Sequence, residues 1–430
     1  MNAIELSLLT YVDHHADRLT GLLSDLVRIP SENTPPNGNE RACQDFIAAR
    51  LRSAGFEVDL YQLQEAPGLA AHPLYWPGRM YEDRPNIGAL RKGSGTGRSL
   101  LLSGHIDTVP RGTLPWTRDP FSGEIENGRL YGRGSNDMKA GVASNLFAME
   151  ALAELGIRLR GNLLFESVVD EEFGGGNGTL AGRLRGFNAD AAVIAEPSFL
   201  RVCPAQRGGR TAHITFAAPG GVLTDGRYPG GVVDQLRCFL SAVPEFAAVR
   251  KVKARTHEAY RQSVDPVPVS ITKVITGPWG PREPIGTPES CRVEFYWQLM
   301  PGETQAAVER EFFEWLDSLC GRWPEYFPQR PAVEFPVRWL PGSSTPLSAP
   351  LVTELVSAGA AVLGTAPQVA GIEGPCDMHI FQQHFGTPAV LWGARGGNTH
   401  GSDEYVEIDS LIQATKVLFL FISRWCGVSP

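Results

Sequence analysis

Histidines and acidic residues follow several apolar stretches of this 430-residue chain, at points where predicted strands end. The stretch SLLLSGHIDTVP places His105 and Asp107 directly after the apolar run Ser99–Leu102. Side chains alternate along an extended segment, so these two residues share a face. An imidazole beside a carboxylate suits a metal ligand whose ring is oriented by an acid. Alone, the pair also fits an ordinary surface turn, so its interpretation depends on the other acids of the chain.

Further segments supply more candidate ligands. Asp137 precedes an Ala-rich helical stretch, where the helix dipole favours a carboxylate. The acidic run Asp170-Glu171-Glu172 follows the predicted strand Asn162–Val169, and taken alone it also fits a solvated turn. The remaining candidates are Glu196, after the predicted strand Asp190–Ala195, and His400.

The residue types of this set indicate a divalent metal site. Several carboxylates at one point repel one another unless a cation neutralises them. Imidazole and carboxylate ligands suit zinc, cobalt or manganese better than calcium, which prefers oxygen alone. Where two acids are adjacent, as in Glu171 and Glu172, one can bind the metal while the other deprotonates water as a general base.

The elements that would position these residues predict an α/β fold. Strands and helices alternate along the first half and the last part of the chain, which predicts a mostly parallel sheet. Ligands of such sheets gather outside the carboxyl ends of the strands. Between them the order becomes β-α-β-β-α-β, typical of a compact α+β domain. We therefore expect a catalytic domain of residues 1–206 and 342–430, with 207–341 inserted as a lid or dimerisation domain. Long helices are expected at Leu6–Val27 and Gly230–Val243.

The composition limits the classes of function. With 43% apolar and 20% charged residues, the chain resembles soluble globular proteins, and its length predicts two domains. A net charge of -8 without a Lys/Arg-dense run argues against nucleic acid or an anionic membrane as partner. We expect a small-molecule substrate. We find no signal-peptide pattern and no apolar run of the roughly 18–20 residues that span a bilayer. Seven scattered cysteines without a CxxC motif predict reduced thiols and a cytoplasmic protein.

The segment Gln64–Arg84 is unusually rich in proline and aromatic residues. It carries His72, Tyr75, Trp76 and Tyr81 and shows no regular periodicity. Long loops inside compact domains are usually functional, and aromatic side chains are costly to leave in water. We therefore expect this segment to form a rim of the site or an assembly surface.

Five motifs, in the same chain order, resemble the M20 family of metallopeptidases and amidohydrolases, which includes acetylornithine deacetylases, succinyl-diaminopimelate desuccinylases, aminoacylases and carboxypeptidases. The motifs are GHIDTVP at Gly104–Pro110, GRGSNDMKAG at Gly132–Gly141, DEEFGGGNGT at Asp170–Thr179, AEPS at Ala195–Ser198 and NTHGSDEYV at Asn398–Val406. The resemblance implies that Asp137 bridges two metal ions. It implies His105 and Glu196 as further ligands of one ion, and Glu172 and His400 as those of the other.

The resemblance also implies roles for residues that bind no metal. Glu171 would be the general base, Asp107 would orient His105, and the Asp137–Met138 peptide bond would be cis. One or two ions of zinc, manganese or cobalt fit the family.

The inserted domain departs from the family pattern. The histidine expected near Gly220–Gly226 is missing from the sequence, and Gly286–Pro288 and Gln298 replace the family's Asn and Arg. The nearest residues that could take over substrate binding are Arg207, Arg210 and His213, although His213 also fits an ordinary strand position.

Two enzymatic functions fit these residues. The first is hydrolysis of an amide C–N bond in an N-acyl amino acid or small peptide-like compound, by metal-activated water with Glu171 as base. The alternative is hydrolytic deamination of an electron-poor aromatic amine with release of ammonia, suggested by the aromatic residues Phe295, Tyr296, Trp297 and Trp279. A binding protein without activity is a third interpretation, which the complete ligand set disfavours. Exposed strand edges in the inserted domain favour a homodimer or a higher homo-oligomer.

Overall fold

The computed structural model describes residues 1–220, 231–254, 256–277 and 286–429, which form two compact units. The first unit comprises Met1–Ala205, Ser344–Ile372 and the chain from Cys376 onwards. The second comprises Gln206–Ser343 and Glu373–Pro375. Trp279, Gly230 and the stretch 221–226, on which some sequence expectations rest, lie outside the described residues.

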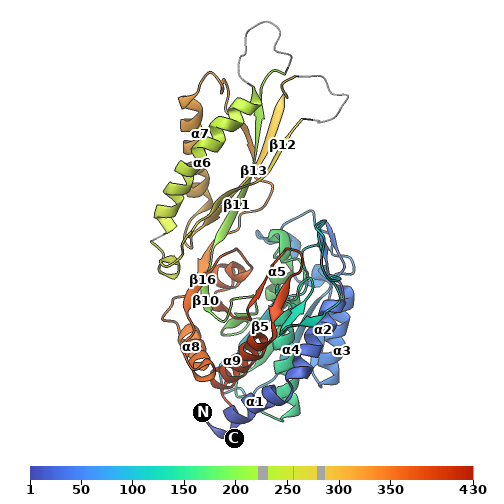
Figure 1. Ribbon diagram of the computed structural model, residues 1–430. Coiled ribbons are helices and arrows are strands. Elements are labelled where there is room, and N and C mark those ends of the chain that lie inside the picture. Colours follow the sequence, from blue (N-terminus) through green and yellow to red (C-terminus); the bar gives the residue numbers. More distant parts are fainter. Residues whose placement is uncertain (221–230, 255, 278–285, 430) are drawn as a thin grey trace. The chain divides into compact units, whose positions relative to one another are not determined.

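A nine-stranded sheet forms the centre of the first unit, in the order β15-β10-β17-β9-β5-β8-β4-β3, with β16 paired to β10 (Figure 1). The neighbouring strands β17, β9, β5 and β8 run parallel, whereas β10, β4 and β3 pair antiparallel. The α/β class is confirmed, and the sheet is mixed rather than mostly parallel. The strands are β3 (Glu57–Tyr61), β4 (Asn86–Arg91), β5 (Leu100–His105), β8 (Leu163–Val168), β9 (Ala192–Ile194), β10 (Val202–Gln206), β15 (Ser343–Ser344), β16 (Val369–Ile372) and β17 (Ala389–Leu391).

Apolar side chains cover both faces of this sheet. Every residue of β5 and β8 is buried. On β5, Leu100 and Leu102 belong to the larger core cluster, while Leu101 between them belongs to a second cluster. This alternation explains why the central strands are apolar throughout, because each face packs against its own layer. The helices of this unit are α1 (Ala3–His14), α2 (Ala16–Arg28), α3 (Arg41–Ser53), α4 (Lys139–Glu154), α5 (Asn177–Arg185), α8 (Pro350–Leu363) and α9 (Ile408–Cys426).

The N-terminal segment differs from its prediction. The single helix expected at Leu6–Val27 is two helices, α1 and α2, separated at His15. The His15 ring stacks on Tyr11 with 4.0 Å between ring centroids, and its Nδ1 lies 2.9 Å from the Tyr11 carbonyl oxygen. Helix α1, before this break, packs mainly on α9, whereas α2, after it, packs mainly on α4. The apolar periodicity continues on both sides of His15, so the sequence pattern does not reveal the change of direction.

The C-terminal helix α9 is buried along most of its length against α1, α4 and α8. Its apolar residues, from Leu411 to Trp425, therefore belong to the core of the first unit. Among the helices in the described ranges, we find none with both the length and the apolar character needed to cross a membrane.

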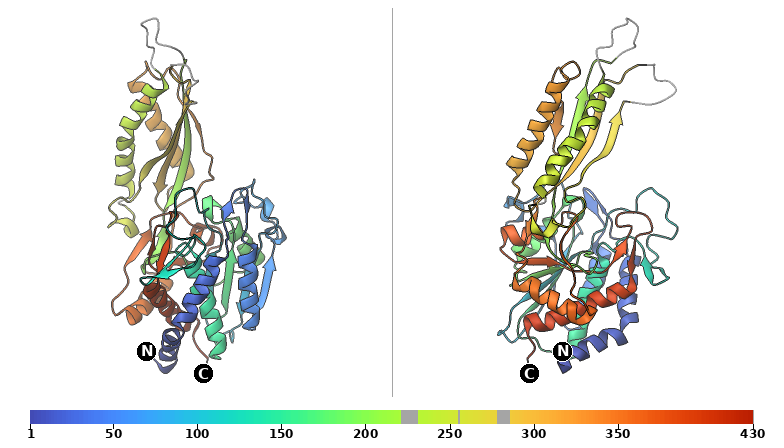
Figure 2. Two further views of the ribbon diagram at one scale, coloured as in Figure 1. Left: turned by 45° about the vertical axis from the view of Figure 1, so that its right-hand side comes forward. Right: turned by 60° about the vertical axis from the view of Figure 1, so that its left-hand side comes forward.

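The second unit is a four-stranded antiparallel sheet, in the order β12-β13-β11-β14, with α6 and α7 side by side on one face (Figures 1 and 2). Helix α6 continues through Pro244, beyond the predicted end at Val243. Proline removes one helical hydrogen bond, but Ala242 and Phe246 on either side are buried in the core and hold the helix in place. In chain order the elements are β11 (Gly208–Ala217), α6 (Val232–Ala254), β12 (Val269–Thr276), β13 (Ser290–Leu299), α7 (Gln305–Arg322) and β14 (Ala332–Glu334).

Candidate metal centre

Loops at the carboxyl ends of the parallel strands bring the candidate ligands together. His105 is the last residue of β5, the acidic run follows β8, and Glu196 follows β9. Asp137 lies just before α4. Residue Gly141 in the first turn of α4 lets the helix approach the loop after β9, because a Cβ there would lie only 2.0 Å from the Ala195 carbonyl oxygen.

Asp137 lies between the two histidines. Its Oδ1 is 3.2 Å from Nε2 of His105, and its Oδ2 is 3.3 Å from Nε2 of His400. The same His400 nitrogen is 3.2 Å from Glu172 Oε2. One carboxylate oxygen therefore faces each imidazole, which is the arrangement required of a residue that bridges two cations. The Asp137–Met138 peptide bond is cis, which confirms that prediction.

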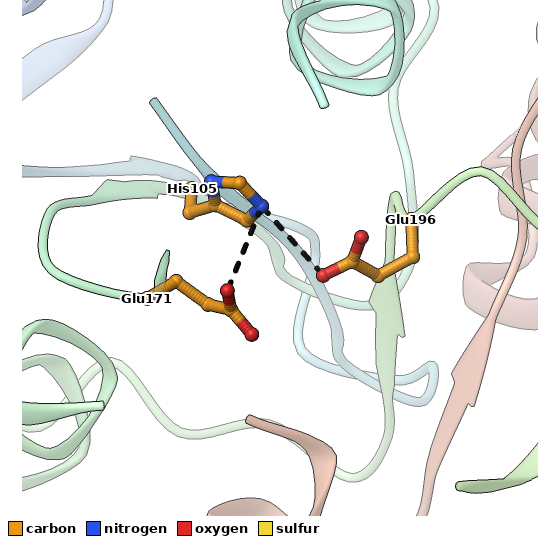
Figure 3. Close-up of side chains that lie close together, drawn as sticks. All are labelled: His105, Glu171 and Glu196. Carbon is orange, nitrogen blue, oxygen red and sulfur yellow. Dashed lines mark ion pairs between the residues drawn. The ribbon is translucent and has the colours of Figure 1, made fainter. Parts of the chain in front are cut away.

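Figure 3 shows the carboxylates of Glu171 and Glu196 directed at the same nitrogen of His105. Nε2 of His105 is 3.9 Å from Glu171 Oε2 and 3.8 Å from Glu196 Oε1. Two atoms that each lie about 2 Å from one cation are at most about 4 Å apart. These separations are long for hydrogen bonds, yet they fit side chains that surround one shared ion.

The electrostatics of the centre also call for a cation. Burial raises the pKa of Glu196 to about 8 and that of Glu171 well above its usual range, and neighbouring carboxylates add to both shifts. Burial alone would lower the pKa of His400, but Asp137 and Glu172 raise it to about 11. The site thus has more buried acidic groups than its two imidazoles could balance if all of these groups were ionised. Since the donors are nitrogen and oxygen atoms, divalent zinc, manganese or cobalt would fit them.

Asp107 contacts more than the histidine that it was expected to orient. Nδ1 of His105 lies 2.8 Å from the backbone oxygen of Asp107 and 3.6 Å from its carboxylate. That fully buried carboxylate accepts hydrogen bonds from the backbone N–H groups of Glu171 and Glu172, both at 3.1 Å, and from Asn33 Nδ2 at 2.9 Å. Asp107 therefore ties the loop that carries two acids of the site to the strand that carries His105.

Glu404 is a positioning residue that our sequence reasoning missed. Its two oxygens accept the backbone N–H groups of Gly134, Asn136 and Asp137 at 3.0–3.1 Å. It also pairs with Arg133 at 2.6 Å, and both side chains are 1% exposed. Glu404 lies within the motif NTHGSDEYV, and this position in the motif is the sign in the sequence that could have identified it.

Arg133 extends this pair to the histidine loop. Its Nη2 donates to the carbonyl oxygens of His400 and Gly401 at 3.2 and 3.0 Å. The ladder between β7 (Arg129–Tyr131) and β19 (Tyr405–Glu407) brings the two loops together, because Tyr131 pairs with Tyr405. The Arg133–Glu404 pair therefore joins the loop of Asp137 to the loop of His400.

We expect Glu404→Gln to weaken metal binding by about ten- to a hundredfold, the usual effect of removing an outer partner of a ligand. Glutamine replaces one acceptor oxygen with an NH₂ donor, which would face backbone N–H groups. Competition with a chromogenic chelator measures the affinity, and Glu407→Gln, three residues further along, is the matched control. Unchanged affinity in Glu404→Gln would contradict the positioning role.

The three candidate substrate residues lie in the second unit and have partners within it. Arg207 donates to Gln298 Oε1 at 2.6 Å and to the Glu373 carbonyl oxygen at 3.4 Å. Arg210 contacts Glu309, the Val337 carbonyl oxygen and the Phe335 ring. His213 contacts Glu294 and Arg292. Their part in substrate binding stays a prediction.

Comparison with known proteins finds a matching family profile, similar sequences and a similar fold. The profile of Peptidase family M20/M25/M40 matches residues 101–424. The chain is 26% identical to N-formyl-4-amino-5-aminomethyl-2-methylpyrimidine deformylase of Halalkalibacterium halodurans, over 97% of each chain. It is 29% identical to succinyl-diaminopimelate desuccinylase of Methylobacterium radiotolerans, over 94% of this chain and 96% of that one. The fold resembles the dipeptidase Dug1p of Saccharomyces cerevisiae, with a TM-score of 0.76, 17% identity and full coverage of both chains.

Proposed function

Since the chain belongs to Peptidase family M20/M25/M40, we propose that it hydrolyses the amide C–N bond of an N-acyl amino acid or a small peptide-like compound. The relatives named above act, by their names, on formyl and succinyl amides and on dipeptides. The observation that carries the proposal is the placement of one Asp137 oxygen against each of His105 and His400.

The proposal assigns a set of ligands to each of two divalent ions. His105, Asp137 and Glu196 would hold one ion, and His400, Asp137 and Glu172 the other. When bound, such ions polarise a carbonyl group and lower the pKa of water. Zinc, manganese and cobalt all match the donor atoms.

Glu171 moves the proton in this proposal. Its carboxylate is directed at the ligand cluster (Figure 3), where it can accept a proton from the attacking water. The same carboxyl group then gives that proton to the leaving nitrogen, so that amine and acid separate.

Two of the four aromatic residues that suggested the deaminase alternative are core residues, which disfavours it. Phe295 and Trp297 are fully buried in the core of the second unit, where Trp297 stacks on Phe312 with 4.9 Å between ring centroids. They stabilise the contact between the sheet and its helices instead of offering a surface to an aromatic substrate. Trp279 lies outside the described residues.

A product assay tests the proposal. The metal-loaded enzyme is offered an N-formyl amine, N-succinyl and N-acetyl amino acids, dipeptides and an aminopyrimidine. We expect a new carboxylic acid and a new amine in equal amounts from at least one amide. Ammonia without an acid would establish deamination instead, and the absence of hydrolysis across the panel would contradict the proposal.

We also propose that the enzyme is at least a homodimer. In the described part of the second unit, β12 is an edge strand with Val274 and Ile275 46% and 64% exposed. An edge strand offers its unpaired backbone groups to a second copy. We expect light scattering to give twice the chain mass, and Ile275→Lys to shift the enzyme toward the monomer. Val264→Lys, at a 90% exposed position outside the strand, is the control, and an unchanged mass in Ile275→Lys would contradict this interface.

The cysteines support our proposal of a cytoplasmic location. All seven are present as thiols rather than disulfides in the structure. Burial raises the pKa of Cys426 to about 12 and that of Cys376 well above its usual range, so these thiols stay uncharged near neutral pH. Cysteines that form no disulfide are typical of reducing compartments.

A further inference from the structure

The segment 64–84, which the metal centre does not explain, contacts the acidic loop from one side. It contains the end of one short 3-10 turn, Leu63–Glu65, and the whole of another, Leu69–Ala71, and is otherwise irregular. Tyr81 is nevertheless only 4% exposed, and its hydroxyl donates to Asp170 Oδ2 at 2.6 Å. Asp170 directly precedes Glu171 and Glu172. The carboxylate of Asp170 therefore connects this segment to the two glutamates of the metal centre.

The same segment also contacts the other end of the acidic pair. Nη2 of Arg79 donates to the carbonyl oxygen of Phe173 at 3.3 Å, while its Nε lies 3.9 Å from Asp170 Oδ1. Asn177 accepts the Trp76 N–H at 3.0 Å and donates to the Trp76 carbonyl oxygen at 2.8 Å. The residues on both sides of Glu171 and Glu172 are thus held by segment 64–84.

Asp170 needs such contacts because of its backbone. Its φ angle is 63°, in the left-handed region, which an aspartate adopts as a single residue when its short polar side chain is hydrogen-bonded. Its buried carboxylate lies 3.4 Å from Asn33 Nδ2, and the same amide donates to Asp107 at 2.9 Å. A continuous polar chain therefore runs from Tyr81 through Asp170, Asn33 and Asp107 to the backbone N–H groups of the acidic pair.

The segment is itself anchored. The buried guanidinium of Arg84 forms an ion pair with Glu40 at 2.6 Å, and both side chains are at most 2% exposed. Nη1 of Arg84 also donates to the Met80 carbonyl oxygen at 3.1 Å, next to Tyr81. The Tyr81 hydroxyl therefore approaches Asp170 from a fixed position.

We propose that Tyr81 is a positioning residue for hydrolysis, whose hydrogen bond to Asp170 fixes the turn from which Glu171 and Glu172 project. The inference rests on the proposed function, because those two glutamates are the base and a ligand only if the enzyme is a metal-dependent hydrolase. Removal of the hydroxyl should let the turn relax while the apolar ring of Phe still fills the same space.

The test is Tyr81→Phe beside a matched control, Tyr11→Phe. The Tyr11 hydroxyl also donates to a carboxylate, that of Glu154 at the far end of α4, away from the acidic loop. On the best amide from the product assay, we expect Tyr81→Phe to lower kcat about tenfold with KM unchanged, as is usual for outer partners, and Tyr11→Phe to keep both values. Arg79→Met, which removes the contact with Phe173, should lower kcat in the same way.

A second readout needs no activity. By hydrogen–deuterium exchange, amides 170–176 should exchange about tenfold faster in Tyr81→Phe than in wild type, and no faster in Tyr11→Phe. Wild-type kcat and exchange in Tyr81→Phe would overturn the inference, as would an equal loss in both variants that follows a common fall in melting temperature. A wild-type enzyme that hydrolyses no amide, with faster exchange in Tyr81→Phe, would sink the proposed function and leave only the finding that the Tyr81 hydroxyl fixes the turn at Asp170.

Discussion

Glu171→Gln is expected to lower kcat by about 10²–10⁴-fold, the usual contribution of a general base, while the bound metal stays unchanged. Glutamine keeps the size of the side chain and its place beside His105, but it cannot accept a proton at catalytic pH. The substitution therefore removes proton transfer and leaves most of the packing of the centre intact.

The measurement has two parts, steady-state kinetics on the amide found by the product assay and metal content of the purified variant. Glu57→Gln, at an exposed position of β3, controls for the loss of one negative charge. The two parts also distinguish a general base from a metal ligand. This distinction is needed because the ligand atoms of Glu171, His105 and Glu196 all lie within 4.8 Å of one another. Loss of metal together with activity would make Glu171 a ligand, and retained activity would contradict any role in the reaction.

Asp137→Asn is expected to lower kcat by a comparable factor, because it weakens metal binding. In the wild type, the two oxygens of Asp137 face His105 and His400, and one carboxylate charge would serve both ions. The amide removes that charge and turns one oxygen into a donor directed at a ligand nitrogen. Loss of several kcal/mol of charge stabilisation corresponds to about a thousandfold or more in rate.

Metal analysis and calorimetric titration with Zn²⁺, Mn²⁺ or Co²⁺ check this result, beside kinetics at saturating metal. Asp17→Asn, at an exposed position of α2, is the control. If the Asp137 variant binds two ions with wild-type affinity, the carboxylate does not bridge them. If it binds one ion and keeps wild-type activity, the reaction needs only a single metal.

Most of the fold could be predicted because its elements have strong local patterns. The apolar run at Ser99–Leu102 and the alternation in β13 mark strands whatever their neighbours are. The break at His15 and the passage of α6 through Pro244 could not be predicted, because packing against other helices and strands outweighs the local signal there. The antiparallel outer strands of the central sheet likewise depend on how the chain returns to the sheet edge.

The candidate ligands could be chosen from residue type and motif, since imidazoles and carboxylates after strands have a limited chemistry. Apart from Asp107, the positioning residues could not be chosen in this way. Glu404, Tyr81 and Asn33 act through hydrogen bonds to residues that are distant in sequence, and each of these residue types has many ordinary structural uses.

The amino-acid sequence by itself determined the α/β class, the ligand types and their order along the chain, because periodicity and donor chemistry are properties of single segments. Only the tertiary structure decided which oxygen of Asp137 faces which histidine, that Asp107 holds the backbone of the acidic loop, and that segment 64–84 supports that loop. These features arise where remote segments approach within hydrogen-bond distance, and such an approach depends on the packing of the whole unit.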